Sequence, residues 1–271
     1  CTDCLDRRSV LPALQHGCYR NSHLATVPLA LNVALHRAAG TWAHQVDAFI
    51  GLTEFLRQRV VDAGLPASRV YVKPNFYPGN PAVAPWDQRQ PVVVFAGRLT
   101  AEKGVATLIR AWQLWGLEAP ELRVLGDGEL RGELESMAAG LPVRFLGQVD
   151  AAEAQRQIAQ ASLLVLPSEC FEGFPMVVRE AFAFGTPAAV SDLGPLPGIV
   201  RHGVGGVVFD ARNPESLLHT VRTAWQAPGR LENLGQGARQ AFDTLYNEEA
   251  NYMTLMRVYG QAMAHIRPKR T

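Results

Sequence analysis

Short apolar runs that alternate with helical patterns constrain the fold of this chain from residue 92 onward. The run Val92-Val-Val-Phe-Ala96 is representative, because it is uniformly apolar and precedes a longer segment with apolar residues three and four positions apart. This order is typical of parallel strands joined by helical crossovers, and uniformly apolar strands fit a sheet that is covered on both faces. The pattern predicts an α/β fold with a doubly wound parallel sheet.

The same periodicities locate the individual elements. Strands are expected at residues 92–96, 122–125, 143–146, 162–166, 188–190 and 206–209, and helices at residues 103–115, 129–139, 151–160, 175–185 and 214–227. Before them we expect helices at 25–39 and 54–63 and strands at 46–51 and 70–72, and after them a helix at 248–266. Prolines at 78, 81 and 85 predict a linker between the two groups.

Composition argues against two classes of protein. The net charge of +1 argues against a dedicated nucleic-acid binder, which must neutralise many phosphates. The sequence contains no apolar stretch long enough to span a bilayer, and no signal peptide opens it. We therefore expect a cytoplasmic protein, whose basic end Arg267-Pro-Lys-Arg270 could touch the inner face of an anionic membrane.

Three of the four cysteines lie near the start of the chain and raise the question of a metal site. Cys1, Cys4, His16 and Cys18 could hold zinc through three thiolates and one imidazole. Only one residue separates His16 from Cys18, whereas ligand pairs usually have about two to four between them. The alternative is a set of reduced cysteines packed near the chain start, and the sequence leaves both readings open.

Glu172 and Glu180 flank the point where the strand at 162–166 leads through a loop into a helix that begins near Pro175. Backbone N–H groups at such a helix start lack intrahelical partners, and together with the positive end of the helix dipole they suit a phosphate. One carboxylate can then face the group attached to that phosphate, while the other accepts hydrogen bonds from paired hydroxyls such as those of a ribose. The pair indicates a nucleotide-sugar site, with two solvated surface charges as the alternative.

Two cations follow the strand at 92–96. Arg98 offers a forked donor to a phosphate and Lys103 a mobile point charge, and both come at the carboxyl end of a strand, where ligands bind in such sheets. A basic residue after a strand is often merely solvated. This loop therefore supports a donor site only in combination with Glu172 and Glu180.

These segments resemble the motifs of glycosyltransferase family 4, whose members have the GT-B fold of two Rossmann-like domains. The motifs are Phe95-Ala-Gly97-Arg98-Leu99 with Lys103-Gly104, Leu125-Gly-Asp-Gly-Glu129, Val143-Arg-Phe-Leu-Gly147, and Glu172-Gly-Phe-Pro with Glu180-Ala-Phe-Ala-Phe-Gly-Thr-Pro187. Two positions depart from the family pattern. Pro175 stands where glycine is frequent and removes one amide donor, and Gly198 stands where relatives often carry glutamate.

The resemblance implies a division into domains. Residues 1–72 would be the C-terminal portion of an acceptor-side Rossmann-like domain, 73–90 a linker, 91–247 the complete nucleotide-sugar donor domain, and 248–271 a helix packing back toward the N-terminal part. The chain begins with Cys1, and its first strand-like segment comes only near Val46. We therefore expect that the natural protein begins earlier and that this chain alone has low activity.

The resemblance also implies roles for individual residues. Arg98 and Lys103 would hold the donor diphosphate, Glu172 the sugar and Glu180 the ribose hydroxyls. The other expected donor contacts are Gly97, Gly126 and Gly128, the backbone of Gly173, Phe174, Met176 and Val177, and, around the base, Arg144, Phe145 and Leu146. Members of the family typically retain the anomeric configuration and need no divalent metal or other cofactor, which agrees with the lack of an Asp-x-Asp triplet in this sequence.

The leading hypothesis is a hexosyltransferase that moves a sugar from a UDP- or GDP-sugar to a saccharide or lipid-linked acceptor. One alternative is a non-catalytic module that binds nucleotide-sugars, and another is a GT-B sugar epimerase. An epimerase would need further acid and base residues in the cleft, and the sequence offers no clear set of them.

Overall fold

The computed structural model describes residues 2–265, within which the chain forms two compact units. Unit 1 combines the described residues up to Lys73 with those from Tyr252 onward, and unit 2 is Pro74–Asn251. Cys1, one of the potential zinc ligands, and the basic end at 267–270 lie outside the described residues. The expectations that depend on them stay predictions.

Unit 2 is built on a six-stranded parallel sheet. Its strands are β3 (Gln90–Ala96), β4 (Glu121–Leu125), β5 (Val143–Gly147), β6 (Ala161–Leu166), β7 (Ala188–Ser191) and β8 (Gly206–Phe209). They lie in the order β5-β4-β3-β6-β7-β8, and every neighbouring pair is parallel. The chain thus builds outward from β3 to β5, returns to the centre, and builds outward on the other side from β6 to β8.

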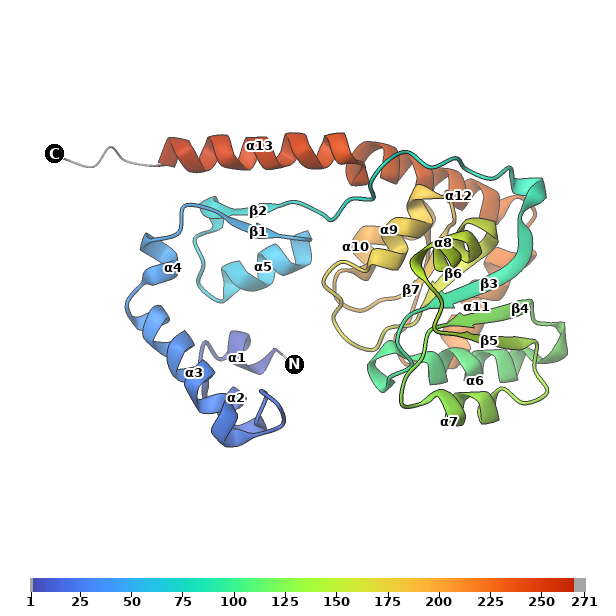
Figure 1. The fold of residues 1–271 in the computed structure, drawn as a ribbon, viewed down its shortest axis with the longest axis horizontal. Helices are drawn as coiled ribbons and strands as arrows, with labels where there is room; N and C mark the ends of the chain where they lie inside the picture. The colour runs from blue at the N-terminus through green and yellow to red at the C-terminus, as the bar shows by residue number, and fades with distance from the viewer. Residues whose placement is uncertain (1, 266–271) are drawn as a thin grey trace. The chain divides into compact units, whose positions relative to one another are not determined.

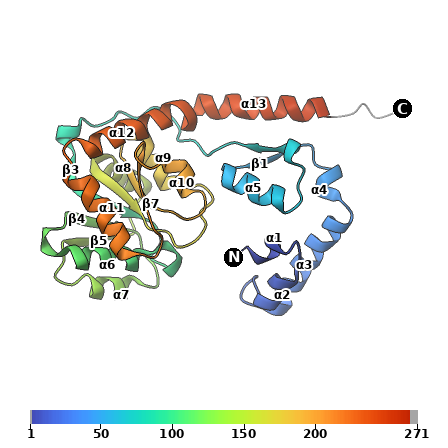
Figure 2. The same ribbon diagram turned by 180° about the vertical axis from the view of Figure 1, so that it is seen from behind.

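Helices cover both faces of this sheet (Figure 1). The connections contain α6 (Val105–Trp115), α7 (Arg131–Met137), α8 (Ala151–Gln160), α9 (Met176–Ala183) and α10 (Leu196–Val200). Because crossovers between parallel strands are right-handed, the reversal of direction puts α6 and α7 on one face and α8 and α9 on the other. α6 packs against α7 and α11 (Pro214–Gln226), and α9 against α8 and α12 (Arg230–Ala241). In the reverse view of Figure 2, α11 lies in front of the sheet. The predicted doubly wound α/β fold is confirmed.

Side-chain caps explain where two of these helices begin. Asp150 Oδ1 accepts a hydrogen bond from the Glu153 N–H at 2.8 Å at the start of α8, and Asn213 Oδ1 accepts one from the Ser216 N–H at 2.9 Å at the start of α11. Such caps satisfy backbone donors that the helix itself leaves unpaired. Both helices begin at the residues that the sequence predicts.

The ends of α9 and the existence of α12 differ from expectation. Pro175 is the N-cap of α9 rather than its first residue, and the helix ends at Ala183. The pattern does not predict α12, because Gly235 and Gly237 lower its helix propensity. Neither glycine has room for a side chain, since a Cβ would lie 2.5 Å from the Gly185 oxygen at one position and 2.1 Å from the Val204 oxygen at the other. Close packing therefore selects glycine in this helix.

The core of unit 2 surrounds the central strands. β6 is buried along its whole length, and Phe95 of β3, Trp112 of α6 and Phe182 of α9 are fully buried. The Trp112 indole N–H stays paired, because it donates to the Pro120 carbonyl at 2.9 Å. Burial of Phe182 fixes α9 against the sheet, and with it the glutamate two residues earlier.

Unit 1 contains a parallel pair of short strands, β1 (Phe49–Gly51) and β2 (Val70–Val72). Its helices are α1 (Asp3–Asp6), α2 (Leu11–His16), α3 (His23–Ala38), α4 (Thr41–His44), α5 (Glu54–Asp62) and most of α13 (Glu248–His265). The sequence does not predict α1, α2 and α4, which are too short to show a period, and β1 begins three residues later than expected. None of the described helices is both long and apolar enough to cross a membrane.

Single helical turns complete the secondary structure. They are η1 (Ala67–Arg69), η2 (Trp86–Gln88), η3 (Ala101–Lys103) and η4 (Gly116–Glu118), together with the π-helical segment η5 (Phe242–Tyr246). η3 carries Lys103, a predicted phosphate ligand, and separates β3 from α6.

Arg89 secures the C-terminal end of α9. Its guanidinium donates to the Phe184 and Ala161 carbonyls at 2.6 and 3.0 Å and to Thr186 Oγ1 at 2.8 Å. The side chain is buried, which lowers the pKa of the guanidinium. A cation beside the last carbonyls of a helix also interacts favourably with the helix dipole.

We expect Arg89→Ala to lower the free energy of unfolding by about 2–4 kcal/mol, because it leaves buried carbonyl oxygens without donors. Urea unfolding of the variant beside Arg110→Ala measures this. Arg110 is an exposed arginine of α6, and its loss should cost less than about 0.5 kcal/mol. Equal costs for the two variants would contradict this account of Arg89.

Candidate functional site

The two loops that carry the predicted charges meet where the sheet reverses direction. β3 and β6 are neighbours, and the loops after them begin at Gly97 and Pro167. In open parallel sheets such a reversal leaves a crevice beyond the carboxyl ends of the strands, where ligands bind. The candidate site is therefore set by the strand order.

Gly104 allows these loops to approach one another. Its φ is 68°, and a Cβ at this position would lie only 2.0 Å from the Pro167 carbonyl oxygen. The Glu169 N–H donates to the Glu102 carbonyl at 2.8 Å and holds the loops together on the same side. Only glycine fits both the backbone conformation and the space.

Lys103 and Glu172 are in direct contact across this junction. Lys103 Nζ lies 2.7 Å from Glu172 Oε1, and the side chains are only 19% and 13% exposed. Ser168 Oγ donates to the same carboxylate oxygen at 2.6 Å, and the buried Ser191 hydroxyl donates to the Ser168 carbonyl at 2.6 Å. The structure thus brings together a predicted phosphate ligand and a predicted sugar ligand. The two serines, which sequence reasoning missed, hold the carboxylate in place.

A cavity of about 520 Å³ lies at the ends of β3 and β4, and it is lined by residues of the loop that leads to Lys103. Its lining includes the predicted Gly97, Arg98 and Gly126, and it adds Asp127, Gln148 and Val149, which were not predicted; the remaining lining residues are Ala96, Leu125 and Ala154. The signal that could have found Gln148 and Val149 is their position directly after β5, at the same edge of the sheet.

Other predicted contacts lie around the cavity and do not all line it. Arg144, Phe145 and Leu146 are on β5, with Arg144 exposed, and the lining begins just after that strand. The role expected of these three around a base stays a prediction. The Gly128 N–H already donates to Asp127 Oδ1 at 2.7 Å.

Arg98 projects into solvent. Its side chain is 73% exposed, and its nearest acidic partner is Glu102 at 3.4 Å. An exposed pair of this kind contributes little to stability, so the guanidinium can exchange this partner for an incoming anion at small cost. Arg98 and Lys103 therefore differ, because one is free to move and the other is held in a contact.

The start of α9 carries the predicted backbone contacts. Gly173 is exposed, Phe174 is buried with its ring 5.2 Å from that of Tyr246, and Met176 and Val177 begin the helix. The N–H groups of Met176 and Val177 belong to the first turn, where an α-helix has no partners for its donors. The helix dipole adds positive potential there.

Glu180 of α9 is a partly buried carboxylate, with a side chain that is 20% exposed. Arg179 Nη2 lies 3.6 Å from its Oε1, Gln155 of α8 also hydrogen-bonds to it, and Tyr77 donates to Gln155 Oε1 at 3.0 Å. Burial raises the pKa of the Glu180 carboxyl, while Arg179 and Gln155 oppose this rise. Burial, reinforced by the negative charge of Glu180, raises the pKa of Tyr77.

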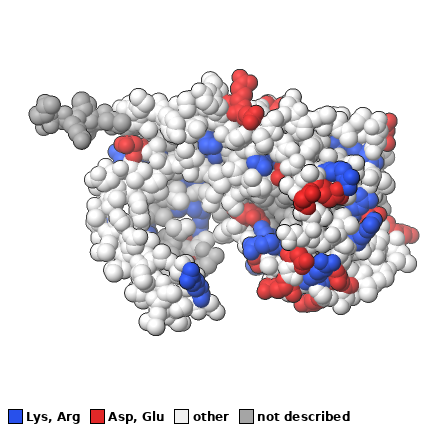
Figure 3. All heavy atoms as spheres, viewed as in Figure 1, with Lys and Arg blue, Asp and Glu red and all other residues white. Residues whose placement is uncertain are grey.

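The cations of this site act locally within an acidic unit. Unit 2 contains 20 Asp and Glu residues against 14 Lys and Arg residues. The face in Figure 3 shows red and blue side chains intermixed over unit 2. An anionic ligand would therefore be attracted by short-range contacts with Arg98, Lys103 and the α9 amides rather than by the net charge of the unit.

The structure shows no preformed metal site within residues 2–265. These include Cys4, His16 and Cys18, yet no group of three or more His, Cys, Asp or Glu side chains there could hold a metal ion. His16 lies instead 3.4 Å from Asp3.

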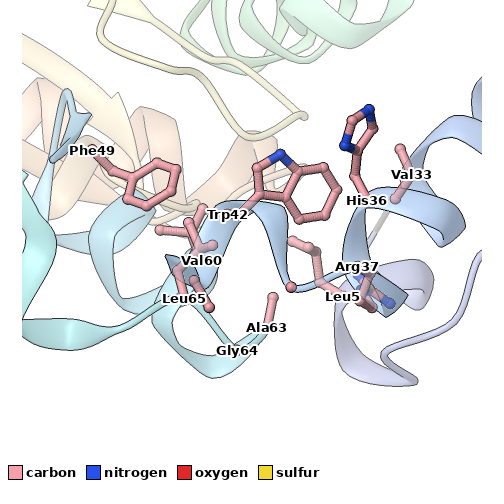
Figure 4. A pocket seen from close by; sticks show the side chains of 12 residues that line it. Leu5, Val33, His36, Arg37, Trp42, Phe49, Val60, Ala63, Gly64 and Leu65 are labelled. Carbon is pink, nitrogen blue, oxygen red and sulfur yellow. The ribbon is translucent and has the colours of Figure 1, made fainter. Parts of the chain in front are cut away.

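A second cavity, of about 330 Å³, lies within unit 1 (Figure 4). Trp42, Phe49, Val60 and Leu65 face it from α4, β1, α5 and the turn after α5. This lining is mainly apolar, whereas a sugar or a phosphate needs several hydrogen-bonding groups. The cavity at the ends of β3 and β4 is the better candidate for a nucleotide-sugar site.

Comparison with known proteins shows the family of this chain. A family model described as glycosyl transferases group 1 matches residues 79–241. An uncharacterized glycosyltransferase of Methanocaldococcus jannaschii is 32% identical over 63% of this chain and 46% of its own length. A D-inositol 3-phosphate glycosyltransferase of Thermobispora bispora is 31% identical over 65% of this chain and 44% of its own length. The chain thus spans less than half the length of these curated relatives.

Solved structures show the same fold. Anabaena HepE, in complex with UDP and glucose, superposes with a TM-score of 0.69 at 20% identity, over 83% of this chain and 66% of that one. Sucrose-phosphate synthase of Thermosynechococcus elongatus gives 0.70 at 23% identity, over 86% and 62%. At these identities the likeness concerns the fold alone, and it confirms the predicted GT-B type of α/β fold.

We expect Gly104→Ala to cost about 2–4 kcal/mol of unfolding free energy, because the new methyl group must push the Pro167 loop away. Gly140→Ala is the matched control, since Gly140 has a φ of 79° and a methyl group added there would meet no atom within 4 Å. It should cost only about 1 kcal/mol. Urea unfolding of both variants decides the matter, and equal losses would show that the close approach is unimportant.

The raised pKa of Glu180 makes stability depend on pH. The folded state binds the proton of this carboxyl more tightly than the unfolded state, so its ionisation costs folding stability as pH rises above the ordinary glutamate value. Glu180→Gln cannot ionise. The melting temperature of Glu180→Gln minus that of the wild type should therefore increase between about pH 4 and about pH 7. A difference that stays constant or falls over this range would contradict the assignment.

Proposed function

Because the chain belongs to the family of group 1 glycosyl transferases, we propose that it takes part in moving a hexose from a UDP- or GDP-sugar to a saccharide or lipid-linked acceptor. The observation that carries the proposal is the contact between Lys103 and Glu172 at the reversal point of the sheet, together with a cavity at the same edge that Gly97, Arg98 and Gly126 line. This arrangement offers cations for a diphosphate and a carboxylate for the sugar joined to it.

The donor would lie along the carboxyl edge of the sheet. Its base would occupy the cavity beyond β4 and β5, next to Gln148 and Val149. Glu180, which neighbours α8 through Gln155, would accept hydrogen bonds from the two ribose hydroxyls. The diphosphate would meet Arg98, Lys103 and the first turn of α9.

The existing contacts suit this role. Within the described residues, Lys103 and Ser168 both bond to Oε1 of Glu172, and Oε2 remains available to a sugar hydroxyl. An ammonium has three donors, so Lys103 can keep Glu172 and also bind a phosphate oxygen. In the proposed complex, the pair would keep the two groups close to the positions that the donor requires.

The chemistry would be stabilisation of a leaving diphosphate. As the bond between the anomeric carbon and the phosphate oxygen breaks, negative charge grows on the diphosphate, and Arg98, Lys103 and the α9 amides would stabilise it. The acceptor hydroxyl would attack the same face that the leaving group vacates, and its proton would pass to a phosphate oxygen. Transfer would then retain the anomeric configuration and need no divalent metal, as the resemblance to family 4 implies.

The names of relatives support the substrate classes. A Mycobacterium tuberculosis relative, 34% identical over 52% of this chain and 37% of its own length, is a GDP-mannose-dependent phosphatidylinositol dimannoside mannosyltransferase. That name combines a nucleotide-sugar donor with a lipid-linked acceptor. A cytoplasmic location and a membrane contact of this chain remain predictions from its sequence.

Thermal unfolding with a panel of UDP, GDP, their sugars and the adenine equivalents tests the donor site. We expect one base to raise the melting temperature of the wild type, because a ligand at about 100 times its Kd adds about 2.7 kcal/mol to the native state. Glu180→Ala should lose most of this shift. Glu118→Ala, an exposed glutamate before β4, at the opposite edge of the sheet, should keep it.

The outcomes separate the alternatives. No shift with any nucleotide would sink the donor-site proposal. Donor binding without release of nucleoside diphosphate in the presence of acceptors would favour a non-catalytic binding module, and formation of a free epimeric sugar would favour an epimerase.

A further inference from the structure

Arg179 is a buried arginine in the N-terminal half of α9, where the helix dipole disfavours a cation. It is 9% exposed and lies in the first half of the eight-residue helix, whose N-terminal dipole is positive. Arg89 and Arg239, in contrast, bond to the Phe184 and Ala183 carbonyls at the other end, where the dipole favours a cation. Burying a charge rarely improves stability over an apolar residue of similar volume. Neither the helix dipole nor folding stability therefore explains why an arginine occupies this position.

The contacts of Arg179 link Glu180 to the first residues of unit 2, Pro74–Asn75–Phe76–Tyr77, which we call the strap. One terminal nitrogen donates to the Phe76 carbonyl, and the other lies 3.6 Å from Glu180 Oε1. The guanidinium also lies over the Tyr77 ring, 5.5 Å from its centroid. The strap and Glu180 thus share one cation.

Hydrogen bonds hold the strap against the rest of unit 2. The Tyr77 N–H donates to the Tyr246 carbonyl at 2.9 Å, and Asn251 donates to the Pro74 carbonyl at 2.8 Å. The Tyr77 hydroxyl donates to Gln155, which in turn bonds to Glu180. Two routes therefore run from the strap to one carboxylate, through Arg179 and through Gln155.

We propose that Arg179 is a positioning residue of the donor site, which orients the Glu180 carboxylate toward the two ribose hydroxyls by holding it against the strap. The inference rests on the proposed function, and it goes beyond it by assigning ribose recognition to a residue that does not touch the nucleotide. A carboxylate that accepts two adjacent hydroxyls must be fixed in rotation and ionised. Arg179 serves both needs, because it contacts one oxygen and opposes the effect of burial on the pKa of the carboxyl.

The test compares ribose with its deoxy counterpart. Kd values for UDP and 2′,3′-dideoxy-UDP, or for the guanosine pair if the wild type prefers GDP, are measured for the wild type, Arg179→Gln and Arg179→Lys. We expect Arg179→Gln to weaken UDP binding about tenfold, as for one lost charge-assisted contact, and to leave the dideoxy nucleotide nearly unchanged. Arg179→Lys keeps the charge, so its Kd for UDP should lie between that of the wild type and that of Arg179→Gln.

Two further measurements separate positioning from general damage to the fold. In a Glu180→Gln background, Arg179→Gln should no longer change the ratio of the two Kd values, because the group through which it acts is gone. The pH at which UDP affinity is half maximal should rise in Arg179→Gln. Among the described residues, the other groups that face Glu180 are the uncharged Gln155 and Tyr77, which stays neutral because the loss of Arg179 raises its pKa further.

Each result decides the proposal. Equal weakening of UDP and the dideoxy nucleotide would show a merely structural role and overturn it, as would a ribose preference that survives in Arg179→Gln. A wild type that binds no nucleotide would overturn the proposed function and this inference together. If Arg179→Gln does not fold, Arg179→Met, an apolar residue of similar length, gives the same comparison.

Discussion

The parallel pairing of β3 with β6 is the interaction on which the candidate site depends. Val93 and Val94 lie opposite Leu163 and Leu164, so the loops after both strands emerge at one edge of the sheet. The winding reverses between these strands, and the helices that follow them diverge to opposite faces. Gly104 then meets Pro167, and Lys103 reaches Glu172. Neither loop could form this contact without its neighbour.

The two ends of α9 have different roles. Its C-terminal end contributes to stability, and its first turn belongs to the candidate site. Arg89 and Arg239 bind its last carbonyls, where charge and helix dipole agree, and they fix the helix to the body of unit 2. Its first turn offers unpaired amides to a ligand, and Glu180 lies between these ends in a place that burial makes unfavourable for a charge. Sites that bind charged ligands often hold such costly groups, and the surrounding packing compensates for them.

Two carboxylates of one site are held in different ways. Glu172 lies on a loop and depends on Lys103 and Ser168 for its position. Glu180 lies on a helix that Phe182 anchors in the core, and its partners Arg179 and Gln155 are tied to the residues that open unit 2. In the proposed donor complex, Glu172 would contact a variable sugar and can lie on a loop, whereas Glu180 would match the fixed geometry of a ribose and benefits from a rigid support.

The sequence by itself determined the class of fold and pointed to the charged residues of the candidate site, because strand and helix periods and the residues at strand ends are local properties. It located α8, β2, β8 and the start of α11 without error, and it singled out Arg98, Lys103, Glu172 and Glu180. It could not locate α12, because the glycines of that helix are required by its close packing against Gly185 and Val204 rather than by a helical pattern. Only the tertiary structure decided that Ser168 and Ser191 support Glu172 and that Arg179 joins Glu180 to Phe76. Those contacts join residues whose approach depends on strand order and helix packing, which no local pattern encodes.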